Sequence, residues 1–285
     1  LDFHMSHQYR NEPELILSLF CDGPIEKGRD ASHGGVEFYN LCCDGAGLAV
    51  VADSFAALGK HIVEEKTLSW PECVRALRSN FKESNGEWVR SLLASTPKFG
   101  AGGTPADGWA ETLSREFSDY VASHRTPDGF RMIPGLFSWA DTVRFGKTVP
   151  ATPNGRRAGE PISHGANPCN GFCRNGAATA AARAVAAIQP GYGNTAPLQI
   201  ELDQGFLKSS PDPAGQLMAL FEGHFKLGGT LVNVNIVEAA KLRAAEKEPE
   251  KYPELIVRVT GFSAYFMMLS PDFRKLVVDR IIESA

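Results

Sequence analysis

The residues whose chemistry is most unusual in this sequence surround a single glycine near the carboxy terminus. In Arg258–Val259–Thr260–Gly261–Phe262 apolar and polar residues alternate as in a strand, and the glycine interrupts the alternation. A glycine in such a place usually marks a bulge, a bend or a close approach of the backbone. It is also the only residue whose α-carbon carries two hydrogens, and losing one leaves a planar radical delocalised over two amides. Gly261 is therefore either a structural glycine or a store for an unpaired electron.

A glutamate in a glycine-rich segment is the second candidate. Glu37 lies in the segment 34–40, GGVEFYN, where its neighbours are mostly glycine or apolar. Burying a carboxylate is costly unless it is paired, so Glu37 is interpreted either as a structural ion-pair partner or as a substrate contact. His33 and His164 lie in glycine-containing loops and could move protons, but loop histidines are mostly solvated, so both rank below Glu37.

Consecutive arginines occur in a long segment rich in proline, glycine and asparagine. Arg156 and Arg157 lie within residues 150–175, and so long an irregular passage is usually functional. The two guanidinium groups could meet a substrate carboxylate or cap the carbonyl groups of the loop, and we favour the structural role.

Cysteine usage indicates a reducing compartment. The sequence has six cysteines in 285 residues, which is too few for a disulfide framework: Cys21, Cys42, Cys43, Cys73, Cys169 and Cys173. The last two are four residues apart, but no second pair or histidine cluster completes a metal site, so we predict no metal.

Composition excludes several classes of protein. Apolar residues make up 43% and charged residues 22%, so a sizeable core is available. The formal net charge of −4, with no basic run, disfavours nucleic acid or an anionic membrane as a partner. No apolar run approaches the about 18 residues of a membrane span. The sequence starts at Leu1 without an initiator methionine or a signal-peptide pattern, and we interpret it as continuing from residues upstream.

Predicted strands and helices alternate, which is typical of the α/β class. Strands are expected at 36–41, 198–202 and 231–236, and another within 132–145. Helices are expected at 47–65, 87–94, 109–124, 177–188, 213–227 and 237–247, with two more starting at Ser69 and Ser270.

Several segments in order resemble the glycyl radical enzymes, the pyruvate formate-lyase superfamily. The most specific are the run at 258–266, RVTGFSAYF, and the run at 152–161, TPNGRRAGEP. Further matches are PIEKGRD at 24–30 followed by GG and YN, and GG at 228–229. The resemblance implies an α/β fold that forms the carboxy-terminal half of a ten-stranded barrel. It divides the chain into barrel residues 1–150 and a glycine radical domain, 151–285, with its radical loop at 258–262.

The resemblance also implies a chemistry. Gly261 would carry the radical, and Arg258, Val259 and Phe262 would support the radical loop. A separate activating enzyme with S-adenosylmethionine and an iron–sulfur cluster would install the radical, and no bound cofactor is expected. The radical would take hydrogen from a cysteine, whose thiyl radical would attack a small-molecule substrate. Oxygen would cut the chain at Gly261, so we expect the protein to work in the cytoplasm of an anaerobe. The resemblance also implies a homo-oligomer.

One part of the family pattern is absent. Lyase-type members carry their thiyl cysteine in a cysteine–x–glutamate motif upstream of the GG and YN segment, and this sequence has none there. Cys42 and Cys43 follow that segment, so we reject them and expect them to pack at the start of the next helix. The chain alone is therefore expected to be inactive. It is either the carboxy-terminal part of a longer lyase or a radical-carrying subunit that docks with a chain bearing the cysteine.

Within the family we favour an arylacetate decarboxylase of the 4-hydroxyphenylacetate type. Members of that branch hold the ring substituent with a second glutamate in about the region of Glu37. The carboxy-terminal segment from Val259 to Arg280 also looks more like that branch than like the dehydratases. The alternatives are a radical dehydratase or another carbon–carbon lyase of the formate acetyltransferase kind.

Overall fold

A computed structural model describes residues 2–127, 129–139, 141–169, 177–189, 196–205 and 211–282. The helices are α1 (Asp2–Asn11), α2 (Leu15–Phe20), α3 (Pro24–Lys27), α4 (Leu48–Leu58), α5 (Trp70–Arg78), α6 (Gly86–Ala94), α7 (Pro105–Ser123), α8 (Thr142–Thr148), α9 (Ala177–Ala187), α11 (Pro213–Lys226), α12 (Ala239–Lys247) and α13 (Pro271–Asp279). The strands are β1 (Asn40–Asp44), β2 (Arg131–Gly135), β3 (Leu198–Asp203), β4 (Val232–Val237), β5 (Ile256–Arg258), β6 (Ser263–Tyr265) and β7 (Ile281–Ile282). None of the described helices is long and apolar enough to cross a membrane.

The described strands form three small sheets, two of them parallel. β1 pairs with β2, and β3 lies between β4 and β7, all in parallel, whereas β5 and β6 form an antiparallel hairpin. Parallel neighbours need a crossover connection, and α11 supplies it between β3 and β4. The predicted α/β class is therefore confirmed in its parallel strands and crossover helices.

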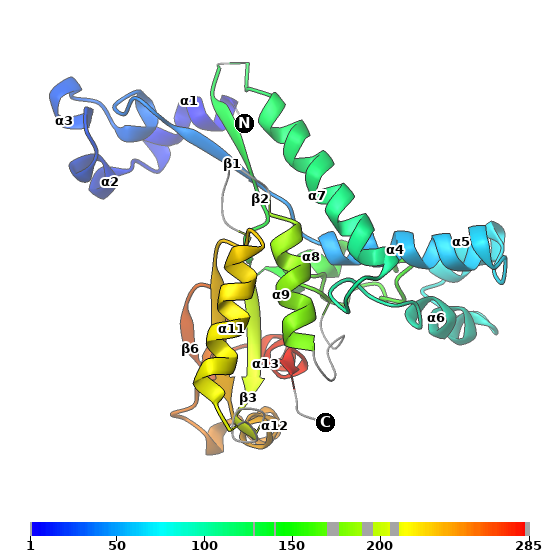
Figure 1. The fold of residues 1–285 in the computed structure, drawn as a ribbon. Helices are drawn as coiled ribbons and strands as arrows, with labels where there is room; N and C mark the ends of the chain where they lie inside the picture. The colour runs from blue at the N-terminus through cyan, green and yellow to red at the C-terminus, as the bar shows by residue number, and fades with distance from the viewer. Residues whose placement is uncertain are drawn as a thin grey trace.

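The two faces of β3 differ sharply. Leu198, Ile200 and Leu202 are at most 1% exposed and belong to the largest apolar cluster, together with residues of α9 and α11. Figure 1 shows these two helices side by side over one face of the strand. Because side chains alternate across a strand, Gln199 and Glu201 point to the opposite face. That polar face receives the carboxy-terminal elements.

Local sequence signals set the helix boundaries as expected. Ser270 caps α13 by accepting a hydrogen bond from the Phe273 amide at 3.3 Å, and Ser69 does the same for α5 within a capping box. Gly228, with φ +101°, follows the end of α11 in the left-handed conformation that glycine adopts without strain. The helix predicted at 47–65 is present as α4 and ends in a π-helical segment, Gly59–Glu64.

Two expectations about the amino-terminal half need correction. The strand expected at 36–41 is displaced to β1, because pairing with β2 begins at Asn40. Cys42 and Cys43 therefore lie within a strand and do not pack at the start of α4, and the Cys42 side chain is exposed. The division at residue 150 stays a prediction, and the largest apolar cluster takes residues from both sides of it, such as Leu48 and Val185.

An amino-terminal arm made of α1, α2 and α3 projects from the rest of the molecule, and β1 connects it to the body (Figure 1). Helix α2 buries none of its residues. Its large apolar side chains are 66–83% exposed at four positions, Leu15, Ile16, Leu19 and Phe20. An apolar patch of this kind is typical of a surface that contacts further protein.

Candidate active site

Gly261 lies in the turn of a tight antiparallel hairpin. The Gly261 hairpin, residues 256–265, pairs Ile256 with Tyr265 and Arg258 with Ser263. The turn is closed by a hydrogen bond of 2.9 Å that the Val259 amide donates to the Phe262 carbonyl. This places Thr260 and Gly261 at its tip, where Gly261 is exposed.

The structural reasons for a glycine are absent at this position. The backbone of Gly261 is outside the left-handed region, so an L-residue could adopt it. A Cβ built on Gly261 would meet no heavy atom of the chain within 4 Å. Neither backbone conformation nor crowding among the described residues explains the glycine.

The three supporting residues are brought together with Gly261. Val259 is 1% exposed and belongs to the carboxy-terminal apolar cluster, which anchors the hairpin. Arg258 donates to the Ser263 hydroxyl across the hairpin at 3.5 Å. Phe262 follows the glycine in the chain and is 50% exposed. The structure places these residues around the turn, and their roles in radical chemistry stay predictions.

Two buried charges beneath the hairpin were missed. Arg280 donates to the Val259 carbonyl at 3.2 Å, and its Nη2 lies 3.5 Å from Oε1 of Glu201. The side chains of Arg280 and Glu201 are 8% and 2% exposed. Burial raises the pKa of Glu201, while Arg280 and a hydrogen bond from Gln199 oppose the rise. The available signal in the sequence was a glutamate between Ile200 and Leu202 of a predicted strand, because a charge among apolar residues requires a partner.

His164 is buried, which corrects the expectation that it is solvated. Its side chain lies in the folded interior, with the residue 4% exposed. Burial, and after it the positive charge of Arg280, lower the pKa of His164 to about 3. His164 is therefore neutral at physiological pH and adds no charge beside Arg280. His33, in contrast, is exposed and stacks on Tyr9 with ring centroids 3.7 Å apart.

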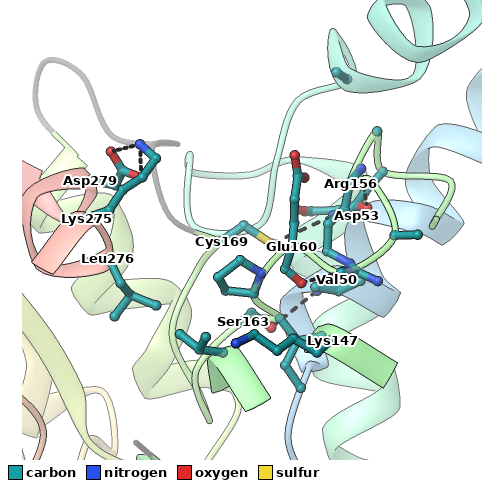
Figure 2. A pocket seen from close by; sticks show the side chains of 18 of the residues that line it. Val50, Asp53, Lys147, Arg156, Glu160, Ser163, Cys169, Lys275, Leu276 and Asp279 are labelled. Carbon is teal, nitrogen blue, oxygen red and sulfur yellow. Dashed lines mark hydrogen bonds and ion pairs between the residues drawn. The ribbon is translucent and has the colours of Figure 1, made fainter. Parts of the chain in front are cut away.

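A cavity of about 890 Å³ lies between α4, the segment 154–163 and α13. Figure 2 shows Cys169 between Asp53 on one side and Lys275 and Asp279 on the other. Burial raises the pKa of Asp53 to about 6, opposed by a hydrogen bond from the Phe99 amide at 2.7 Å. Burial and the negative charge of Asp53 raise the pKa of the Cys169 thiol, which stays protonated. No residue of the Gly261 hairpin is among the described residues that line this cavity.

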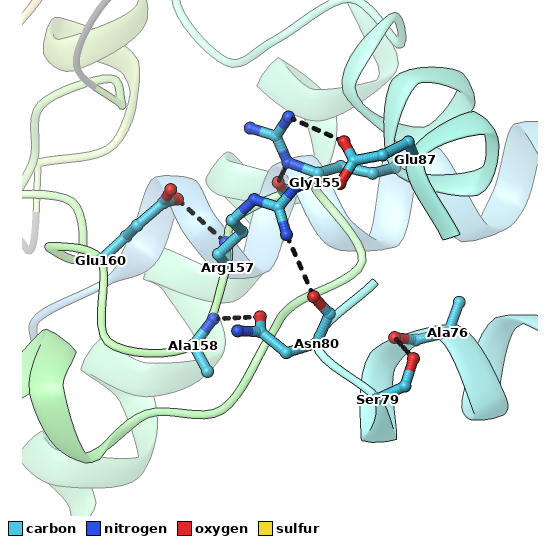
Figure 3. A network of polar contacts seen from close by, with 9 residues as sticks. Ala76, Ser79, Asn80, Glu87, Gly155, Arg157, Ala158 and Glu160 are labelled. Atoms are coloured by element: carbon cyan, nitrogen blue, oxygen red, sulfur yellow. Dashed lines mark hydrogen bonds and ion pairs between the residues drawn. The ribbon is translucent and has the colours of Figure 1, made fainter. Parts of the chain in front are cut away.

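Arg156 and Arg157 have the structural role that we favoured. Arg156 is 7% exposed, and its guanidinium donates to four backbone carbonyls, those of Val149, Pro150, Arg157 and Glu160. Arg157 forms an ion pair with Glu87 and donates to the Asn80 carbonyl at 3.1 Å, as Figure 3 shows. Together the two side chains fix the segment 149–160 and join it to the end of α5 and to α6.

Glu37 is exposed in this chain. Among the described residues Glu37 forms no hydrogen bond or ion pair. Its role as a substrate contact stays a prediction. Cys173 lies outside the described residues, and in the described part no three His, Cys, Asp or Glu side chains gather to hold a metal.

Two family models match most of the chain. One, described as pyruvate formate lyase-like, matches residues 2–146, and the other, described as glycine radical, matches residues 162–267. The second range includes the whole Gly261 hairpin.

Curated proteins and solved structures give concordant matches. The isethionate sulfite-lyase of Desulfovibrio desulfuricans is 33% identical over 244 residues, which cover 82% of this chain and 28% of that protein. The trans-4-hydroxy-L-proline dehydratase of Clostridioides difficile is 26% identical, over 95% of this chain and 34% of the relative. The glycerol-bound B12-independent glycerol dehydratase of Clostridium butyricum superposes with a TM-score of 0.85 at 29% identity, over 99% of this chain and 35% of that one.

A glycyl radical enzyme from Archaeoglobus fulgidus superposes with a TM-score of 0.86 at 32% identity, over 97% of this chain and 35% of that one. This chain therefore spans between 28% and 35% of the length of these four relatives. Three findings indicate the same family: the matched family models, the identity to the sulfite-lyase and the superpositions. The chain belongs to the glycyl radical enzymes of the pyruvate formate-lyase superfamily.

Proposed function

We propose that Gly261 stores an organic radical that starts catalysis in a radical lyase. The observation that carries the proposal is that neither backbone conformation nor crowding requires glycine at this exposed turn. The two flanking amides delocalise the spin, and the absence of a side chain lets the α-carbon become planar. The neighbours that fix the turn, Val259 and Arg258, hold it without touching the α-carbon.

The radical would reach substrate through a cysteine outside this chain. The Gly261 radical takes a hydrogen atom from the thiol and becomes an ordinary glycine again. The resulting thiyl radical takes a hydrogen atom from a carbon of the substrate, and the product radical recovers a hydrogen atom from the same thiol at the end. Cys169 is unsuited to this role, because its cavity is not lined by the hairpin.

Radical elimination from a small hydroxylated substrate is the reaction that we place first. Three of the four named relatives are a sulfite-lyase and two dehydratases, names that denote loss of sulfite or of water. In this chain's enzyme, abstraction of a hydrogen beside the leaving group would allow that group to depart. Decarboxylation of an arylacetate, which the sequence favoured, ranks second, since these relatives do not support it and Glu37 is exposed.

Activation would need a separate enzyme that uses S-adenosylmethionine at an iron–sulfur cluster. The exposed tip of the Gly261 hairpin supports such an encounter, because a partner can reach the α-carbon. The apolar side chains on α2 support contact with further protein, either the rest of a longer enzyme or a companion subunit with the cysteine. Because oxygen destroys a glycyl radical, we infer an anaerobic cytoplasm as the working compartment.

Electron paramagnetic resonance tests the proposal on the protein expressed from its complete gene. After anaerobic activation we expect a doublet, split by the remaining α-hydrogen of Gly261. Exposure to air should then cut the chain at this residue, which mass spectrometry locates. An activated, aerated sample in which the chain stays whole would refute the assignment.

The same activated sample identifies the substrate class. We would assay isethionate, glycerol and trans-4-hydroxy-L-proline beside 4-hydroxyphenylacetate. Sulfite or water loss from one of the first three supports radical elimination, whereas carbon dioxide release from the last would restore the decarboxylase assignment.

A further inference from the structure

We propose that Arg280 is a positioning residue that fixes the Gly261 hairpin on the polar face of β3, with Glu201 as its buried counter-charge. The inference rests on the proposed function, because it concerns where the radical carbon is held. It adds a residue that lies outside the radical loop and 19 positions further along the chain.

The contact is assembled from three elements that are distant in sequence. Arg280 stands between α13 and β7, and β7 pairs with β3 so that Ile281 lies opposite Glu201. This register places the Arg280 backbone beside the Glu201 side chain. The guanidinium then reaches the hairpin, donating from Nη1 to the Val259 carbonyl while Nη2 faces the carboxylate.

Both backbone groups of Val259 are engaged as a result. Its amide donates to Phe262 across the turn, and its carbonyl accepts from Arg280. Val259 is therefore fixed to the sheet two residues before Gly261, on the inward side of a turn whose tip is exposed. A Cβ on Gly261 would meet no heavy atom of the described residues within 4 Å, so the tip is open on that side.

Only a paired charge is expected to be stable here. A buried guanidinium or carboxylate is costly alone, and each of these two has the other as its counter-charge. His164 is the other titratable group beside Arg280, and its lowered pKa keeps it neutral. Gln199 adds a hydrogen bond to the same Glu201 oxygen at 2.9 Å, which fixes the carboxylate for its partner.

Position is decisive for this chemistry. Hydrogen-atom transfer requires the two reacting atoms to come within about 3–3.5 Å, and a misplacement of about 1 Å can cost about 100-fold in rate. A hairpin released from Arg280 should therefore still store the radical, yet pass it to the cysteine slowly. This separation between storage and transfer distinguishes positioning from a general loss of structure.

The test uses Arg280→Met in the complete protein, with Arg274→Met as the matched control. Arg274 lies on α13 and donates to the Met267 carbonyl at 3.4 Å, beyond the hairpin. Deuterium exchange followed by mass spectrometry should show faster exchange of the hairpin amides in Arg280→Met and unchanged exchange in Arg274→Met. This measurement needs no radical, so it tests the contact even if the proposed function fails.

A second readout follows radical transfer. In D2O the thiol carries deuterium, so each passage of the radical to a thiol leaves one hydrogen and one deuterium on the Gly261 α-carbon. Repeated return steps that remove the hydrogen exchange it for deuterium, which collapses the doublet. We expect Arg280→Met to keep at least half of the radical per chain, but to lose about 100-fold in the rate of this collapse and in kcat. Arg280→Lys, which keeps one charged donor, should recover part of both rates.

Should Arg280→Met fail to fold, the double variant Arg280→Met/Glu201→Gln removes both charges and leaves none unpaired. The same exchange and collapse rates are then read on this variant, with Glu201→Gln alone as its reference. Wild-type hairpin exchange and wild-type collapse in a folded variant without Arg280 would overturn the proposal. Absence of any radical in the wild-type protein would instead refute the proposed function.

Discussion

Replacing Gly261 with alanine separates structure from chemistry at the centre of the site. The added Cβ meets nothing within 4 Å, and the backbone lies outside the left-handed region. A substitution of this kind on an exposed turn changes the free energy of unfolding by about 1 kcal/mol or less, in either direction. We therefore expect the melting temperature of Gly261→Ala to stay within about 4 °C of the wild type.

The radical should nevertheless be lost completely. Alanine has a single α-hydrogen and a methyl group that resists the planar geometry of the radical. After anaerobic activation we expect no doublet in the paramagnetic resonance spectrum and no turnover. The assay compares the number of spins per chain, the rate of product formation and the melting curve on one preparation.

A glycine with the opposite character serves as control. Gly86 begins α6, and a Cβ there would overlap the carbonyl oxygen of Phe81, which is backbone and cannot move aside cheaply. Gly86→Ala should lose about 2 kcal/mol of stability or more while keeping the radical in the folded fraction. The reasoning is refuted if Gly261→Ala still turns over, or if it destabilises the protein as much as Gly86→Ala does.

Three further predictions concern the surroundings. The pKa of Asp53 is raised from 3.8 to about 6, so the folded protein binds this proton more tightly than the unfolded chain does. The free energy of unfolding should therefore fall by about 3 kcal/mol as the pH rises from about 4 to 6. Asp53→Asn should remove this fall, measured by denaturant titration at several pH values. Arg156→Lys cannot serve four carbonyls, so it should lower the free energy of unfolding by roughly 2–3 kcal/mol, and an unchanged melting curve would contradict the structural role. Glu37→Gln should leave kcat/KM within about twofold if elimination is the reaction, because an exposed carboxylate forms no contact worth more than about 0.5 kcal/mol; a large loss would revive the substrate contact.

Local sequence was sufficient wherever the structure depends on neighbouring residues. The alternation of Leu198, Ile200 and Leu202 predicts β3, and Ser270 followed by proline predicts the start of α13. These features need only backbone geometry and capping within one element, which the order of residues specifies directly. Around Gly261 the sequence predicted an interrupted strand, which the structure shows as a hairpin, and the radical role came from the resemblance of the run 258–266 to the family.

Tertiary structure alone decided which distant residues meet. The pairing of β7 with β3 brings Arg280 to Glu201 across 79 positions of the chain, and no local pattern encodes that register. The tertiary fold likewise buried His164, which is neutral as a result, and left Glu37 exposed to solvent. Both residues lie in glycine-containing segments of the sequence. The physical reason is the same in each case: desolvation and pairing of a charge depend on what the rest of the chain places around it.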